Sequence, residues 1–148
     1  MNKLKICVAG ATGWAGSALA RGIAQTEDIS LVAAVSRTHA GKVLGDVLVE
    51  TRLSCPVYAT AQEALDSHAC DVLFDFTQPE VAKANCLAAL QHGAHVVIGT
   101  SGLTDSDYTD LAQAAEQSQL GVLAVGNFAI TVVLLQKFAE MAARYIPQ

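Results

Sequence analysis

The sequence predicts an α/β fold in which a doubly wound parallel sheet of about six strands carries helices on both faces. Short strand-like segments alternate with longer helix-like segments along nearly the whole chain. Most of the strand-like segments are apolar without interruption and rich in β-branched residues, as in parallel strands that are covered on both faces. Repeated β-α-β units of this kind imply right-handed crossovers between neighbouring strands.

The expected elements follow one another without an internal repeat or a linker. The strand-like segments are Leu4–Ala9, Ile29–Val35, Val72–Phe76, His95–Ile98 and Gly121–Val125, with a short strand near residue 57. The helix-like segments are about 14–26, 80–92, 105–118 and 130–145. Glycines and mixed polarity between residues 37 and 58 predict a loop with one irregular helical turn near 42–48.

Three helix starts carry a capping box or a close variant of one. In this motif the threonine oxygen accepts from a first-turn N–H, while the acid three residues later reaches back to the chain. The three motifs are Thr60-x-x-Glu63, Thr77-x-x-Glu80 and Thr104-x-x-Asp107. Pro79 suits the first turn of a helix, and Gly93 is placed to end that helix in the left-handed conformation.

Composition narrows the classes of partner. The chain has 148 residues, of which 52% are hydrophobic and 16% charged, so we expect one folded domain with a sizeable core. The net charge is −5 and no run of Lys or Arg occurs, which argues against nucleic acid or an anionic membrane as partner. No apolar stretch reaches the roughly 18 residues of a transmembrane helix, and no signal-peptide pattern is present. These features predict a cytoplasmic protein.

Cysteine and histidine residues form no recognisable chemical site. The four cysteines make no C-x-x-C pair, so we expect buried free thiols, in keeping with a reducing compartment. His39 and His68 are expected to be isolated and exposed. His92 and His95 are three residues apart but are interrupted by Gly93, so no metal site is expected. The sequence shows no recognisable Ser/His/Asp triad, and we assign no catalytic residue.

A glycine loop follows the first strand and precedes a helix. Gly10 permits a tight turn, Gly13 lets the backbone approach a diphosphate, and Gly16 lets the helix pack close to the strand. A strand, a glycine loop and a helix in this order place a diphosphate on a helix N-terminus. We therefore expect a Rossmann-like dinucleotide-binding domain, with a merely tight turn as the alternative.

The segment after the second strand bears on the choice of cofactor. An acid commonly accepts hydrogen bonds from the adenosine ribose about 20 residues past the glycine loop, but Ser36 and Arg37 stand there. A carboxylate repels a 2′-phosphate, whereas the Ser36-Arg37-Thr38 cluster can bind one through charge-assisted contacts. We predict a preference for NADPH over NADH. Alternatively, Arg37 stacks on adenine or points to solvent, which is compatible with either cofactor.

Further small and polar residues follow the later strands. The segments Asp75–Pro79 and Gly99–Gly102 bring hydroxyl groups and glycines to strand ends, where they can meet a ribose or the nicotinamide. Asp75 itself is expected to be structural and to accept hydrogen bonds from neighbouring donors. The last strand leads into 126–128, whose amide and aromatic side chains would face the same crevice.

Five elements, taken together in order and spacing, resemble the dihydrodipicolinate reductase family of bacterial lysine and diaminopimelate biosynthesis. They are Gly10-x-x-Gly13-x-x-Gly16, Asp75-Phe76-Thr77-x-Pro79, Val97-Ile98-Gly99-Thr100-Ser101-Gly102, Gly126-Asn127-Phe128 and Leu134-Leu135-Gln136-Lys137-Phe138. The resemblance implies hydride transfer from NAD(P)H to a cyclic, dicarboxylated imine-type substrate. It also implies that the intact enzyme is a homo-oligomer.

The resemblance assigns most of the expected cofactor contacts, and Ser36 joins them from its position after the second strand. The full set is Gly10, Ala11, Thr12, Gly13, Trp14, Ala15, Ser36, Arg37, Phe76, Thr77, Gly99, Thr100, Ser101, Val125, Gly126, Asn127 and Phe128. Three segments depart from the family pattern. Trp14-Ala15 replaces a common Arg-Met pair, which removes a cation, and Ala129-Ile130-Thr131 replaces Ser-x-Gly, which removes the serine hydroxyl. Ser36-Arg37 stands where the family often has an acid or an acid-Arg pair after the second strand.

The chain also lacks the His-His-x-x-Lys-type motif with which the family binds and protonates its substrate. We therefore expect a dinucleotide-binding domain over 1–128 and a connecting helix over 129–148, inactive alone, as an excised domain or a natural short protein. The alternatives are a stand-alone redox-sensing module and the nucleotide domain of another two-domain dehydrogenase, although the Asp75–Pro79 motif argues against the latter.

An apolar stripe along the last helix predicts self-association. The stripe comprises Ile130, Leu134, Phe138, Met141 and Tyr145, flanked by Val133 and Leu135.

Overall fold

The computed structural model describes residues 3–125 and 130–145. Its strands are β1 (Leu4–Ala9), β2 (Ile29–Val35), β3 (Val57–Tyr58), β4 (Val72–Asp75), β5 (His95–Ile98) and β6 (Val122–Ala124). Its helices are α1 (Trp14–Ile23), α2 (Leu44–Leu48), α3 (Ala61–Ser67), α4 (Pro79–Gln91), α5 (Asp105–Ser118) and α6 (Ile130–Ala143).

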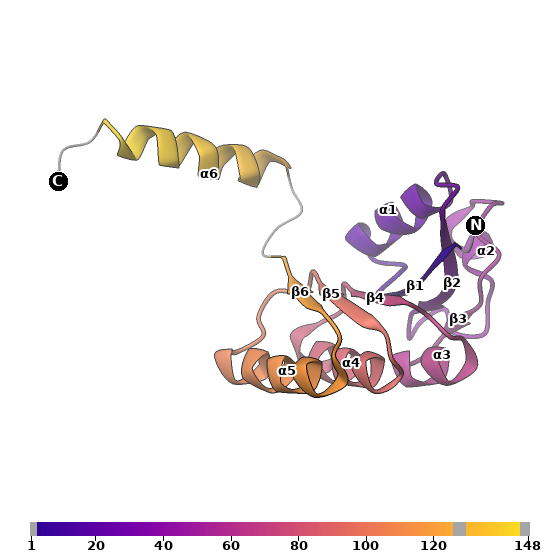
Figure 1. The fold of residues 1–148 in the computed structure, drawn as a ribbon. Helices are drawn as coiled ribbons and strands as arrows, with labels where there is room; N and C mark the ends of the chain where they lie inside the picture. The colour runs from indigo at the N-terminus through magenta and orange to yellow at the C-terminus, as the bar shows by residue number, and fades with distance from the viewer. Residues whose placement is uncertain (1–2, 126–129, 146–148) are drawn as a thin grey trace.

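The six strands form one parallel sheet in the order β3-β2-β1-β4-β5-β6 (Figure 1). The chain moves outward from β1 to β3 in one direction and from β4 to β6 in the other. The strand order therefore reverses between β1 and β4, where Ala9 pairs with Asp75. Ligands of doubly wound sheets bind beyond the carboxyl ends of the strands at such a reversal. The predicted Rossmann-like fold class is confirmed.

Two helical layers cover the sheet. Alternate residues of a strand point to opposite faces, so Ile6 and Val8 pack into a cluster with α1 and α2, while Cys7 and Ala9 pack into a cluster with α3, α4 and α5. Figure 1 shows α1 and α2 on one side of the sheet and α3, α4 and α5 on the other. Both faces of β1 are thereby buried, which explains its uninterrupted apolar sequence.

Two of the three expected helix caps are confirmed. The Thr60 hydroxyl accepts from the Glu63 N–H, and Thr104 forms a full capping box with Asp107. The expectation for Thr77 is wrong, because α4 begins at Pro79 after Gln78, which makes no side-chain cap bond. The Thr77 hydroxyl instead donates to the Asp75 carboxylate at 2.7 Å, a charge-assisted bond that is stronger than a bond to a helix N–H.

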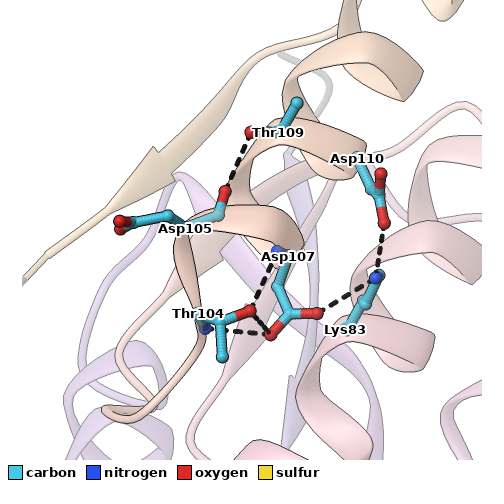
Figure 2. A network of polar contacts seen from close by, with 6 residues as sticks. All are labelled: Lys83, Thr104, Asp105, Asp107, Thr109 and Asp110. Atoms are coloured by element: carbon cyan, nitrogen blue, oxygen red, sulfur yellow. Dashed lines mark hydrogen bonds and ion pairs between the residues drawn. The ribbon is translucent and has the colours of Figure 1, made fainter.

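Helix α5 is joined to α4 by a polar network around Lys83 (Figure 2). The Lys83 ammonium lies 3.0 Å from an Asp107 carboxylate oxygen and 2.6 Å from one of Asp110. Hydrogen bonds from Thr104, followed by that from Lys83, lower the pKa of Asp107 to about 2. Asp107 thus serves both the start of α5 and its contact with α4.

The four cysteines are buried and free, as expected. Burial raises the pKa of the Cys55 and Cys70 thiols to about 11 and that of Cys86 to about 12. The pKa of Cys7 is raised further by the same cause. Since the thiolate is the reactive form, these side chains behave as small apolar groups.

Helix α6 lies apart from the sheet in Figure 1. None of its residues is buried, and the expected apolar stripe is exposed over its full described length. Large apolar patches of this kind mark surfaces that associate, so the self-association expected of this helix stays a prediction. No helix in the described ranges has both the length and the apolarity to cross a bilayer.

Candidate functional site

A cavity of about 470 Å³ opens beyond the carboxyl ends of β1, β2, β3 and β4. Its position beside the reversal of strand order is that of ligand sites in doubly wound sheets. Its wall comprises Gly10, Gly13, Val35, Ser36, Arg37, Thr38, Ala59, Thr60, Phe76, Thr77, Gln78, Val81 and Asn85.

The glycine loop reaches the cavity because two of its positions accept only glycine. Gly10 has a φ of +78°, and a Cβ there would overlap the carbonyl oxygen of Phe76 at the end of β4. A Cβ at Gly16 would overlap the Gly10 carbonyl oxygen. The loop therefore packs backbone against backbone, which holds the start of α1 close to the sheet.

The N-terminus of α1 is open to an anion. Gly13 is the N-cap and offers no side chain to the first-turn N–H groups, and the first turn contains no acidic residue. First-turn N–H groups lack partners within the helix and lie at the positive end of its dipole. The contrast is with α3 and α5, whose first turns are closed by Thr60 and Thr104. Trp14, the first residue of α1, is 90% exposed.

The end of β2 contributes a cluster of hydroxyl groups. The Ser36 hydroxyl is buried and lies 2.8 Å from the Thr12 hydroxyl, which joins the glycine loop to β2. It also lies 3.3 Å from the His39 Nδ1 atom, and Thr38 lies 2.9 Å from the same nitrogen. His39 is therefore half-buried and hydrogen-bonded, and the expectation that it is isolated and exposed is wrong. The exposed Arg37 lies between these residues and lines the cavity.

Asp75 organises the opposite wall. Its carboxylate is fully buried, and one oxygen accepts from the Thr77 N–H, the Thr77 hydroxyl and the Thr100 hydroxyl. The other oxygen accepts from the Asn85 amide at 2.8 Å. Hydrogen bonds to a buried carboxylate replace those it made to water. The expected structural role of Asp75 agrees with these contacts, which fix the loops after β4 and β5 against α4.

The expected cofactor contacts fall into three groups. Six of them line the cavity: Gly10, Gly13, Ser36, Arg37, Phe76 and Thr77. Eight others do not line it: Ala11, Thr12, Trp14, Ala15, Gly99, Thr100, Ser101 and Val125. Among these, Ala11 is fully buried and its N–H donates to the Val35 carbonyl, while the Thr100 side chain faces Asp75. Gly126, Asn127 and Phe128 lie outside the described residues.

Several residues of the wall were missed by the sequence reasoning. Ala59 and Thr60 come directly after β3, so a wider window at the strand end finds them, and Thr60 had been predicted only as a helix cap. Val81 and Asn85 lie within α4, and no sequence signal marks them. Asn85 enters the site because it hydrogen-bonds Asp75.

The other histidines lie away from the cavity. His68 is half-buried and its Nε2 lies 2.9 Å from the Tyr58 hydroxyl, so the expectation of an isolated, exposed side chain is wrong. His92 lies between Ala88 and Asp66, with one ring nitrogen 2.8 Å from each. Among the described residues, no group of His, Cys, Asp and Glu side chains is arranged to hold a metal ion.

The chain is similar to one family of known proteins. Residues 4–128 match the model of "Dihydrodipicolinate reductase, N-terminus". The 4-hydroxy-tetrahydrodipicolinate reductases of Bacillus pumilus and Bacillus cereus are 39% and 38% identical to the chain over 97% and 98% of its length. The chain spans 54% of the length of each of these relatives.

A solved structure supports the same grouping. The dipicolinate-bound dihydrodipicolinate reductase from Paenisporosarcina sp. TG-14 superposes with a TM-score of 0.77 at 30% identity. The match covers 99% of this chain and 56% of that one. The chain thus belongs to the dihydrodipicolinate reductase family, of which it matches the N-terminal domain.

Proposed function

We propose that this chain binds NAD(P)H, with NADPH preferred, as the nucleotide-binding part of a dihydrodipicolinate reductase. The proposal rests on one observation: the same cavity contains the N-terminus of α1, which no side chain caps, and the end of β2, which carries no carboxylate. The helix N-terminus suits a diphosphate. The end of β2 suits a 2′-phosphate beside Ser36 and Arg37.

The residues present fit such a cofactor. The close packing at Gly10 and Gly16 leaves the α1 N-terminus free for the diphosphate. Ser36, Thr38 and Arg37 would face the adenosine ribose, while Phe76 and Thr77 would extend the wall toward the nicotinamide ribose. The bound cofactor supplies a hydride, and the protein supplies position and charge.

In the intact protein the hydride acceptor would be the cyclic dicarboxylated intermediate of lysine and diaminopimelate biosynthesis. We assign nucleotide binding to residues 1–128 and the connection to a substrate-binding part to residues 129–148. The substrate motif expected for the family is missing from the sequence, so the 148-residue chain alone should bind cofactor without turning over dihydrodipicolinate. Four free buried thiols agree with a cytoplasmic location.

Binding is tested by calorimetric titration of the chain with NADPH and with NADH. Trp14 is the only tryptophan and adjoins the glycine loop, so energy transfer from its indole to the reduced nicotinamide gives a second readout. We expect NADPH to bind more tightly than NADH. Tighter binding of NADH would overturn the preference, and no binding of either by the folded chain would overturn the function.

The contribution of Arg37 is tested by the variant Arg37→Gln. Loss of a charge-assisted contact to the 2′-phosphate should weaken NADPH binding about tenfold and leave NADH binding nearly unchanged. Arg21→Gln is the matched control, because Arg21 lies in the last turn of α1 and donates to the Leu48 carbonyl. Equal losses for both cofactors in Arg37→Gln would show that Arg37 does not read the phosphate.

A further inference from the structure

We propose that His39 is a positioning residue that sets the preference between NADPH and NADH by directing the hydroxyl hydrogens of Ser36 and Thr38. The inference rests on the proposed nucleotide binding and adds a residue to which no role has been given. His39 does not line the cavity, so its effect would pass through the two hydroxyl groups that do.

A short chain of polar contacts joins His39 to two hydroxyl groups of the cavity wall. The His39 Nδ1 atom lies 2.9 Å from the Thr38 hydroxyl and 3.3 Å from the Ser36 hydroxyl. The two hydroxyls lie 3.4 Å apart, and Ser36 continues to Thr12 at 2.8 Å. Ser36 is 7% exposed, so few water molecules can compete for its hydrogen.

Counting hydrogens shows why the histidine matters. A hydroxyl group carries a single hydrogen, whereas a phosphate dianion can only accept. If Nδ1 lacks a proton, it takes the hydrogen of Thr38 or Ser36, and that hydroxyl can no longer donate to a phosphate. If Nδ1 carries a proton, it donates to the hydroxyls, and the Thr38 hydrogen is free to point into the cavity. A proton on Nδ1 therefore changes the supply of donors at the ribose 2′ position, and the imidazolium always carries that proton, whereas only one of the two neutral tautomers does.

The surroundings leave His39 free to act in this way. Within the described part of the chain, it forms no ion pair, and its side-chain hydrogen bonds go to Ser36 and Thr38. The other ionisable side chains of the same loop are Arg37 and Lys42, both cations. The glycine loop packed beside it contributes the uncharged Thr12. No carboxylate of these segments competes with a bound phosphate for the hydroxyl hydrogens.

The test is the ratio of NADH to NADPH dissociation constants, measured with the 148-residue chain from about pH 8 to about pH 5. The 2′-phosphate also takes up a proton in this range, so the profile is compared with that of His39→Asn. An asparagine amide can replace Nδ1 as a hydrogen-bond partner but does not titrate. The ratio in the original chain should rise relative to the variant by up to about tenfold as the pH falls.

Two further variants keep the outcome interpretable. Thr38→Val removes one hydroxyl without changing the shape of the side chain, and it should weaken NADPH binding severalfold while sparing NADH. His92→Asn removes a histidine remote from the cavity and should reproduce the original pH profile. Parallel profiles for the original chain and His39→Asn, with NADPH still bound, would overturn the role of His39 alone. Failure of both cofactors to bind at every pH would overturn the proposed function and this inference with it.

Discussion

The Thr100 hydroxyl donates to the buried Asp75 carboxylate over 2.6 Å, which ties the segment after β5 to the end of β4. The two residues are 25 positions apart in the chain. The same carboxylate oxygen holds both the N–H and the hydroxyl of Thr77. One buried charge therefore fixes the relative positions of two loops beside the cavity.

We expect Asp75→Asn to destabilise the fold. The carboxylate accepts four hydrogen bonds, and an amide in its place would turn a donor toward at least one of these donors. A buried polar group left without a partner costs about 1–3 kcal/mol, which urea unfolding would measure. Glu116→Gln, at an exposed position of α5, should change the unfolding free energy by less than about 0.5 kcal/mol. Equal stabilities of the two variants would contradict the role given to Asp75.

Acid should destabilise the contact between α4 and α5. Hydrogen bonds from Thr104 and then Lys83 lower the pKa of Asp107 to about 2. A depressed folded-state pKa gives stability that is present above the unfolded value, about 3.9, and lost as the pH falls through the folded value. The unfolding free energy should decrease from about pH 4 to about pH 2.

The variant Asp107→Asn should flatten this decrease, and Asp105→Asn is the matched control. Asp105 lies in the same first turn, but its side chain points away from Lys83 in Figure 2. An unchanged acid profile in Asp107→Asn, measured by denaturant unfolding, would show that other carboxylates dominate.

A rise in pH should weaken the contact between α3 and α4. One His92 ring nitrogen faces the Ala88 carbonyl and the other faces the Asp66 carboxylate, so the ring is held with both nitrogens as donors. These acceptors, Ala88 first, raise the pKa of His92. A raised folded-state pKa gives stability that is present below the unfolded value, about 6.5, and lost as the pH rises through the folded value.

The titration of His92 can be followed by NMR. Asp66→Asn keeps a hydrogen-bond partner but removes the charge, and it should lower the pKa of His92 toward the unfolded value. The same variant should leave the hydrogen bond from the Gly121 N–H to the His95 ring unchanged, because the His95 ring is paired with Gly121 and not with Asp66. A His92 pKa that does not respond to Asp66→Asn would contradict the ion pair.

Helix α6 should drive association of the chain at high concentration. Phe138 is 61% exposed and Leu134 is 48% exposed on the apolar stripe. Phe138→Glu should therefore lower the weight-average mass in sedimentation equilibrium, because the charge would be buried on association. Glu140→Gln, on the same helix, is the control. A monomeric original chain over the whole concentration range would contradict this prediction.

The sequence by itself determined the order of elements, the parallel sheet and the glycine loop. These follow from local properties: apolar runs such as Leu4–Ala9, and the glycines required beside the first strand. The caps at Thr60 and Thr104 were equally legible, because a capping box involves residues only three apart. Strand-end position also marked Ser36 and Arg37 as parts of the site.

Tertiary structure decided how side chains remote in the sequence share hydrogen-bond partners. Thr77 was expected to cap a helix, yet it donates to Asp75 because the buried carboxylate needs hydrogen-bond donors and the helix begins one residue later, after Gln78. Asn85 donates to that carboxylate from within α4. His39 lies within hydrogen-bonding distance of the Thr38 hydroxyl, and His68 within hydrogen-bonding distance of the Tyr58 hydroxyl. Such choices depend on the desolvation of polar groups in a packed structure, which no local pattern encodes.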